Sequence, residues 1–201
     1  MTMEQEPNKA LRHNRGMLIA LFVLFFGGMA IAGLLRFSGW QPEGKKNKGE
    51  LLEPYGDLRE YTPTLAGGDA YRWSDEPRIW RILVTPAACD SSRRAECSEL
   101  LREVDTVWRL MGKDADRVHV LWVGAPPAGA SLPREVRVLR ADAVLPATLP
   151  RGKGAGDVAA TASADDAAWL VDPNGFVVLR YAPGFDPGDL RTDLARLLKV
   201  N

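Results

Sequence analysis

A long apolar run near the N-terminus dominates the hydropathy pattern of this chain. Residues 17–35 read MLIALFVLFFGGMAIAGLL and contain no charged side chain. A helix rises about 1.5 Å per residue, so this run is long enough to cross the ~30 Å hydrocarbon core of a bilayer. The pattern predicts a cytoplasmic tail over residues 1–16, a transmembrane anchor over 17–36, a polar spacer over 37–49 and one soluble domain over 50–201.

A cleaved signal peptide is the alternative interpretation of this run, because Ala30-Ile31-Ala32 resembles a small-residue cleavage site. The run extends beyond that site and exceeds the usual apolar core of about 7–15 residues, which favours an uncleaved anchor. Positive charges flank the run on both sides and do not fix its orientation. Since a short tail is readily left in the cytoplasm, we expect a single-pass inner-membrane protein with its soluble domain on the periplasmic side.

Two buried strands separated by a helix are predicted in the first half of the soluble domain. Residues 79–84 (IWRILV) and 117–124 (RVHVLWVG) are apolar and rich in β-branched and aromatic side chains, as buried strands are. Between them, over residues 93–111, apolar side chains recur at spacings of three and four, which predicts an amphipathic helix that ends at Gly112. This order implies parallel strands joined by a right-handed crossover.

A hairpin and a final helix are predicted in the second half. Residues 168–171 and 176–181 are apolar and flank the turn DPNG, which is typical of a β-hairpin. Residues 188–200 place leucines on one helical face. Residues 50–73 have an extended pattern with a turn near 66–70, and 125–168 form an irregular region with a short element at 135–139. The predicted fold class is α/β with a central mixed sheet, and the order βαβ then ββα is that of a thioredoxin-like fold.

Charge and cysteine content narrow the classes of function. The chain carries 26 basic and 26 acidic side chains; four and two of these precede residue 37, which leaves 22 basic and 24 acidic. A nucleic-acid surface requires a strong basic excess, so we expect no nucleic-acid partner. The two cysteines, Cys89 and Cys97, suit one disulfide, one redox pair or part of a metal site, and are too few for a disulfide-rich scaffold.

The positions of the cysteines leave two interpretations open. Cys89 lies in the loop after the first predicted strand, and Cys97 lies in the first turns of the following helix. A helix N-terminus lowers the pKa of a thiol, and Arg93 and Arg94 would lower it further, which favours the reactive thiolate of a redox or copper-handling pair. The other interpretation, which the sequence favours, is a structural disulfide that joins the loop to the helix.

The sequence resembles the Sco/SenC group of membrane-anchored, thioredoxin-like proteins. The resemblance is carried by the N-terminal anchor, the passage GELLEP, the strand-to-cysteine passage WRILVTPAAC, and LVDPNGFVVLRYAPG before the last helix. It implies an accessory protein in cytochrome c oxidase biogenesis, with oxidase subunits or other assembly factors as partners and copper(I) as the metal. In that group a Cys-x3-Cys pair and a distant histidine bind copper.

This chain departs from the pattern of the Sco group at its ligands. Seven residues separate Cys89 from Cys97, and the matching region for the histidine, residues 161–168, contains none. His119 is the one histidine of the soluble domain and completes the candidate metal set of Cys89, Cys97 and His119. His119 lies inside an apolar strand, where packing or hydrogen bonding also accounts for it. The adjacent acids Asp165 and Asp166 fit a solvated loop.

The function expected from the sequence is that of a membrane-anchored, thioredoxin-like accessory protein in oxidase assembly, with a degenerate copper and thiol site. The alternative is an active thiol–disulfide oxidoreductase or copper(I) chaperone that uses Cys89 and Cys97. The sequence favours a protein that is not an enzyme, with a thiol–disulfide oxidoreductase as the enzyme class if it is one. No complete Ser-His-Asp set or phosphate-binding loop supports another chemistry.

Overall fold

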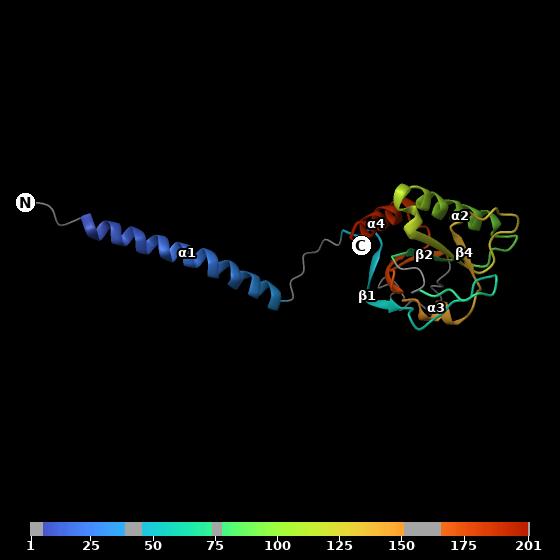
Figure 1. Cartoon of the computed structure of the whole chain (residues 1–201), viewed down its shortest axis with the longest axis horizontal. Coiled ribbons are helices and arrows are strands. Elements are labelled where there is room, and N and C mark those ends of the chain that lie inside the picture. The colour runs from blue at the N-terminus through green and yellow to red at the C-terminus, as the bar shows by residue number, and fades with distance from the viewer. Residues whose placement is uncertain (1–5, 39–45, 74–77, 151–165, 201) are drawn as a thin grey trace, which may run out of the picture. The chain divides into compact units, whose positions relative to one another are not determined.

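The computed structural model describes residues 6–38, 46–73, 78–150 and 166–200 (Figure 1). The chain divides into two compact units, residues 1–45 and residues 46–201. Most of the predicted Gly- and Ala-rich loop, residues 151–165, lies outside the described residues.

The first unit contains one long helix, α1 (Glu6–Phe37). Its segment Asn14–Phe37 is long and apolar enough to cross a membrane, and it is the one helix with these properties in the described part of the chain. Large apolar side chains such as Phe25 and Leu34 are exposed on this helix. An exposed helix that is apolar on all sides is suited to lipid, which supports the predicted membrane anchor.

The second unit is built on a six-stranded mixed sheet with the strand order β1-β6-β5-β2-β3-β4. β2 pairs in parallel with β3, and β3 with β4, whereas β2–β5, β5–β6 and β1–β6 are antiparallel. The strands are β1 (Glu50–Asp57), β2 (Trp80–Thr85), β3 (Val118–Val123), β4 (Val136–Leu139), β5 (Ala167–Val171) and β6 (Phe176–Tyr181).

Helices cover both faces of this sheet, so β2 is buried along its whole length (Figure 1). Helices α2 (Arg94–Arg109) and α4 (Pro187–Val200) lie on one face, where Val104 and Leu194 belong to the same buried apolar cluster as Ile82. The short helix α3 (Val144–Thr148) lies on the other face, where Leu145 and Trp73 contribute to a second apolar cluster. A 3₁₀ turn, η1 (Gly112–Arg117), leads into β3.

The predicted βαβ and ββα units are both present. β2, α2 and β3 form the first unit, and β5, β6 and α4 form the second, which confirms the predicted fold class. The turn predicted near residues 66–70 is also confirmed, because Thr64 and Ala70 form an antiparallel bridge. β1 and β4 extend the sheet at its two edges, from segments in which the sequence predicts only extended or short elements.

Candidate functional site

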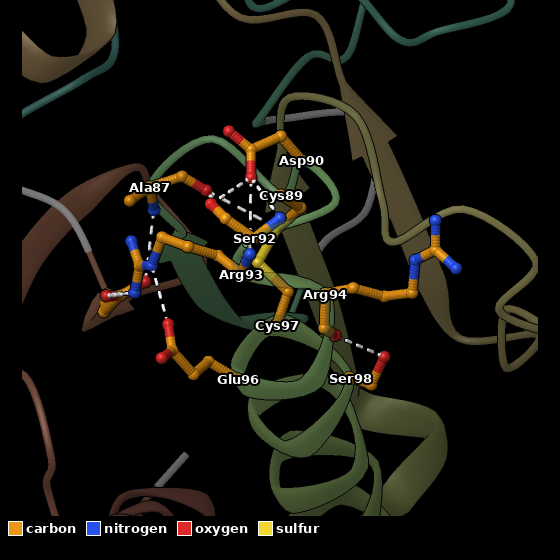
Figure 2. The surroundings of a disulfide bond; sticks show 10 residues. Ala87, Cys89, Asp90, Ser92, Arg93, Arg94, Glu96, Cys97 and Ser98 are labelled. Carbon is orange, nitrogen blue, oxygen red and sulfur yellow. Dashed lines mark hydrogen bonds and ion pairs between the residues drawn. A yellow bond between two sulfur atoms is a disulfide. The ribbon is translucent and has the colours of Figure 1, made fainter.

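The two cysteines form a disulfide beside the carboxyl end of β2 (Figure 2). β2 lies between β3 and β5 near the middle of the sheet, and the chain leaves it at Pro86 to form the loop that carries Cys89. Cys97 lies in the first turn of α2, and its Cα is 5.8 Å from that of Cys89. Buried strand β2 and the amphipathic helix α2 thus fix the two ends of the loop, which brings the cysteines together.

The two cysteine residues differ in their exposure to solvent. Cys97 is 1% exposed and belongs to the apolar cluster beneath α2, whereas Cys89 is half-buried at the edge of that cluster. The carbonyl oxygen of Ala87 lies 3.4 Å from Cys89 Sγ and 3.9 Å from Cys97 Sγ. Of the two residues, Cys89 is therefore the one that is exposed to solvent in part.

Asp90 organises the turn that leads from the loop into α2. Its Oδ1 accepts hydrogen bonds from the backbone N–H of Ser92 at 2.8 Å, from the Ser92 hydroxyl at 2.6 Å and from the backbone N–H of Arg93 at 3.3 Å. The hydrogen bond from the Ser92 hydroxyl is the main cause that holds the pKa of Asp90 below its ordinary value. Asp90 therefore remains an anion and an acceptor at neutral pH.

The two arginines near the disulfide do not supply it with free positive charge. Arg93 donates through Nη2 to Asp166, and its Nε donates to Glu96 at 2.7 Å. These two carboxylates raise the pKa of Arg93. Arg94 is directed away from the sulfur atoms (Figure 2). The sequence-based expectation that both arginines favour a thiolate is therefore not supported, because one charge is balanced by carboxylates and the other is remote.

His119 lies away from the disulfide, on the opposite face of the sheet. Its neighbours on β3, Val118 and Val120, belong to the cluster beneath α2, so the alternation of a strand directs His119 to the other face. There His119 Nδ1 is 3.1 Å from the hydroxyl of Tyr71. In the register of the sheet His119 pairs with Arg81, near the amino end of β2. The structure thus brings Cys89 and Cys97 together and leaves His119 elsewhere.

In the disulfide form, the donor atoms of this site do not fit copper(I). Both sulfur atoms are bonded to each other, and the imidazole of His119 faces away from them. Among the described residues, no group of three His, Cys, Asp or Glu side chains is placed to hold a metal ion. Copper(I) prefers soft thiolate ligands together with further donors, and a disulfide contains no thiolate.

Asp166 is a site residue that the sequence did not identify. It directly precedes β5, and the antiparallel pairing of β5 with β2 places it beside the carboxyl end of β2. It is half-buried and contacts the cysteine loop, whereas the sequence predicts a solvated loop acid. The available signal was its position immediately before an apolar strand; its neighbour Asp165 lies outside the described residues.

Comparisons with known proteins identify the fold. No curated protein matches the chain. Among solved structures it is similar to BsSco, a member of the Sco family of cytochrome c oxidase assembly proteins, at 14% identity and a TM-score of 0.51, over 78% of this chain and 100% of BsSco. It is also similar to Bradyrhizobium japonicum ScoI with copper bound (21% identity, TM-score 0.45, 67% and 95% covered) and to T. cruzi GPX1 (16%, 0.45, 71% and 97%).

The likeness to BsSco supports the fold, and at this identity it carries no conclusion on activity. The predicted thioredoxin-like fold and its likeness to Sco/SenC proteins are confirmed at that level. The family described as transmembrane-like, thioredoxin-like, C-terminal domain matches residues 80–201, which is more than half of the sequence. The chain belongs to this transmembrane-like, thioredoxin-like family.

Proposed function

We propose that this chain is a membrane-anchored accessory protein that acts by thiol–disulfide exchange at Cys89 and Cys97. One observation carries the proposal: Cys89, a half-buried residue after the carboxyl end of β2, is bonded to Cys97, a buried residue at the N-terminus of α2. The proposed arrangement is a cytoplasmic tail (1–16), an inner-membrane anchor (17–36), a spacer (37–49) and a periplasmic domain (50–201). An oxidising compartment would keep the disulfide closed until a partner reduces it.

The proposed exchange begins at Cys89, because Cys89 is half-buried and Cys97 is buried. A thiolate of a partner dithiol bonds to Cys89 Sγ, the Cys89–Cys97 bond breaks, and its electron pair leaves on Cys97 as a thiolate. The N-terminus of α2 stabilises that negative charge. The second thiolate of the partner then attacks the partner sulfur that is bonded to Cys89. This step forms the disulfide of the partner and releases Cys89 as a thiolate. Two protons complete the reduced pair, and the carbonyl of Ala87 can accept a hydrogen bond from a thiol.

The proposed process is the assembly of cytochrome c oxidase, with oxidase subunits or other assembly factors as partners. The Sco-like fold supports this choice, together with a candidate membrane-spanning helix in the same chain. A copper(I) chaperone is the less favoured function, because it would require a reduced pair and a further ligand from the partner. A purely structural disulfide is the remaining alternative.

Trapping in membranes tests the exchange. In the full chain, Cys97→Ser leaves Cys89 as a half-buried free thiol, which should retain partners as mixed disulfides. Cys89→Ser is the matched control, since its remaining thiol is buried and should retain few. We expect the adducts of Cys97→Ser to contain oxidase subunits or assembly proteins. Equal and negligible trapping by both variants would overturn the exchange, and adducts without any oxidase-related protein would overturn the proposed process.

A redox titration and a copper titration distinguish the alternatives. The full chain in detergent micelles is equilibrated in glutathione buffers, and free thiols are counted by alkylation. An exchanging pair should titrate within the range of these buffers, whereas a structural disulfide has a potential below about −300 mV and stays closed. Stoichiometric copper(I) binding by the reduced chain, lost in Cys89→Ser, would instead support the chaperone.

A further inference from the structure

Asp166 contacts both ends of the loop that carries Cys89. Its Oδ1 accepts a hydrogen bond from the backbone N–H of Ala87 at 3.1 Å, and its Oδ2 accepts one from Nη2 of Arg93. Ala87 lies two residues before Cys89, and Arg93 lies four residues before Cys97. We call these contacts the Asp166 bridge.

The backbone around Asp166 fixes the bridge to the sheet. The N–H of Asp166 donates to the carbonyl oxygen of Thr85 at 2.8 Å, which extends the pairing of β5 with the end of β2. Asp166 has a φ of +59°, a left-handed conformation that Asp adopts more readily than most residues. The side chains of Asp166 and Arg93 are 28% and 32% exposed, so water screens their ion pair only in part.

The bridge bears on the balance between disulfide and dithiol. In the oxidised chain the sulfur–sulfur bond closes the ring of residues 89–97. In the reduced chain only noncovalent contacts hold that loop, and closing it again costs conformational entropy. Contacts that keep Ala87 and Arg93 in place after reduction lower this cost. They therefore stabilise the disulfide relative to the two thiols.

We propose that Asp166 is a positioning residue that sets how readily the Cys89–Cys97 disulfide is reduced. It acts through the loop and does not touch either sulfur. The inference rests on the proposed exchange chemistry, since the potential of the pair matters to function only if the pair opens. An intramolecular hydrogen bond and a part-exposed ion pair are each modest, so loss of the bridge should change the reduction equilibrium by about three- to tenfold.

Two substitutions separate the arms of the bridge. Asp166→Asn keeps an oxygen that can accept from Ala87, tolerates the left-handed backbone and removes the negative charge facing Arg93. Asp166→Gly removes both arms and also admits the positive φ without strain. Glu99→Gln is the control. Glu99 pairs with Arg102 on the exposed surface of α2, so this substitution removes one negative charge at a position away from the loop. Arg93→Gln tests the ionic arm from its other end.

The measurement is the equilibrium of each full-length variant with glutathione in detergent micelles. Two glutathione thiols are oxidised to one glutathione disulfide for each Cys89–Cys97 bond reduced to two thiols. We expect Asp166→Gly to raise the equilibrium constant for reduction three- to tenfold, which corresponds to a reduction potential higher by about 14–30 mV. Asp166→Asn should raise the constant by a smaller factor. In the double variant, the effects of Asp166→Asn and Arg93→Gln on this equilibrium constant should not be additive. Glu99→Gln should match the unmodified chain.

The outcomes separate this inference from the proposed function. Equal constants for the unmodified chain and both Asp166 variants would overturn the positioning role, even if the pair titrates and the exchange stands. If the unmodified disulfide resists glutathione, the exchange is overturned, and the same comparison in dithiothreitol still decides the role of Asp166. A residue with only a structural role would lower the unfolding temperature of both redox forms equally and leave the equilibrium unchanged.

Discussion

Asp193 joins the beginning of the thioredoxin-like domain to its last helix, and its carboxylate is 2% exposed. Its Oδ2 accepts hydrogen bonds from the backbone N–H groups of Lys48 and Gly49, at 2.7 and 2.8 Å, and from the hydroxyl of Tyr181 at 2.9 Å. Arg196 Nη1 lies 3.3 Å from Oδ1. We predict that Asp193→Ala strongly destabilises the domain, because this one side chain satisfies donors from three separate segments.

The magnitude follows from the groups left without an acceptor. Asp193→Ala strands the buried N–H of Gly49, the buried hydroxyl of Tyr181 and the part-buried N–H of Lys48, and each buried unsatisfied group costs about 1–3 kcal/mol. Burial, followed by the negative charge of Asp193, raises the pKa of Tyr181, so its hydroxyl remains a donor. Allowing for entry of water, we expect a loss of about 3–5 kcal/mol for Asp193→Ala. Asp193→Asn retains one acceptor oxygen and should cost about half as much.

Urea unfolding of the full chain in nonionic micelles measures these losses. Tryptophan fluorescence reports on the domain, because Trp80, Trp122 and Trp169 are buried there. With a slope near 2 kcal/mol per molar urea, Asp193→Ala should lower the midpoint by about 1.5–2.5 M. Arg196→Gln is the control and should cost less than about 1 kcal/mol, because its side chain is half exposed. A loss for Asp193→Ala no larger than that of Arg196→Gln would refute the reasoning.

Three further substitutions test the core and a turn by the same unfolding measurement. Arg81→Lys should cost about 3–5 kcal/mol, because the fully buried guanidinium donates to a hydroxyl and three carbonyl oxygens that one ammonium cannot reach together; a loss below 1 kcal/mol would contradict this. Gly175→Ala should cost about 1–3 kcal/mol, because its φ is +99° and a Cβ would lie 3.1 Å from the Trp73 ring, and no change would exclude that contact. Burial, and then the hydrogen bond with Asp105, raise the pKa of Glu135. The protonated form therefore favours folding, and this contribution is present below the ordinary pKa of 4.5 and is lost as the pH rises through the raised value. Glu135→Gln should flatten this dependence, and an unchanged pH profile would show that Glu135 does not cause it.

Local patterns were sufficient to predict the central elements of the fold. The pattern predicts a strand over residues 79–84, and β2 spans Trp80–Thr85, because an uninterrupted apolar run with β-branched members has few other stable environments. Edge strand β1 has no such pattern. Pro54 interrupts it, and its register with β6 shifts between Leu51 and Gly56. An edge strand with one paired side is specified by its neighbour, which a single sequence window does not contain.

The site divides in the same way between local and nonlocal features. The closeness of Cys89 and Cys97 follows from a short loop between a strand and a helix, and the sequence predicts it. The role of Asp166 is not local, because it depends on the pairing of β5 with β2, which are some eighty residues apart in the chain. The N–H of Asp166 donates to the carbonyl oxygen of Thr85 as part of this pairing. The neutralisation of Arg93 is nonlocal for the same reason, because one of its two carboxylate partners, Asp166, comes from that distant segment.

The spacing of the cysteines bears on the choice between metal binding and exchange. In the Cys-x3-Cys pattern of the Sco resemblance, the second cysteine would fall at position 93, which is the N-cap of α2. Cys97 lies four residues later, about one helical turn, so it remains on the same face and can still reach Cys89. The extra turn places its sulfur in the apolar cluster, at 1% exposure. A sulfur at that depth can bond to a neighbouring sulfur but offers little access to a third ligand from outside. The longer spacing is therefore compatible with a disulfide and leaves the buried cysteine with little access to a metal ligand from outside.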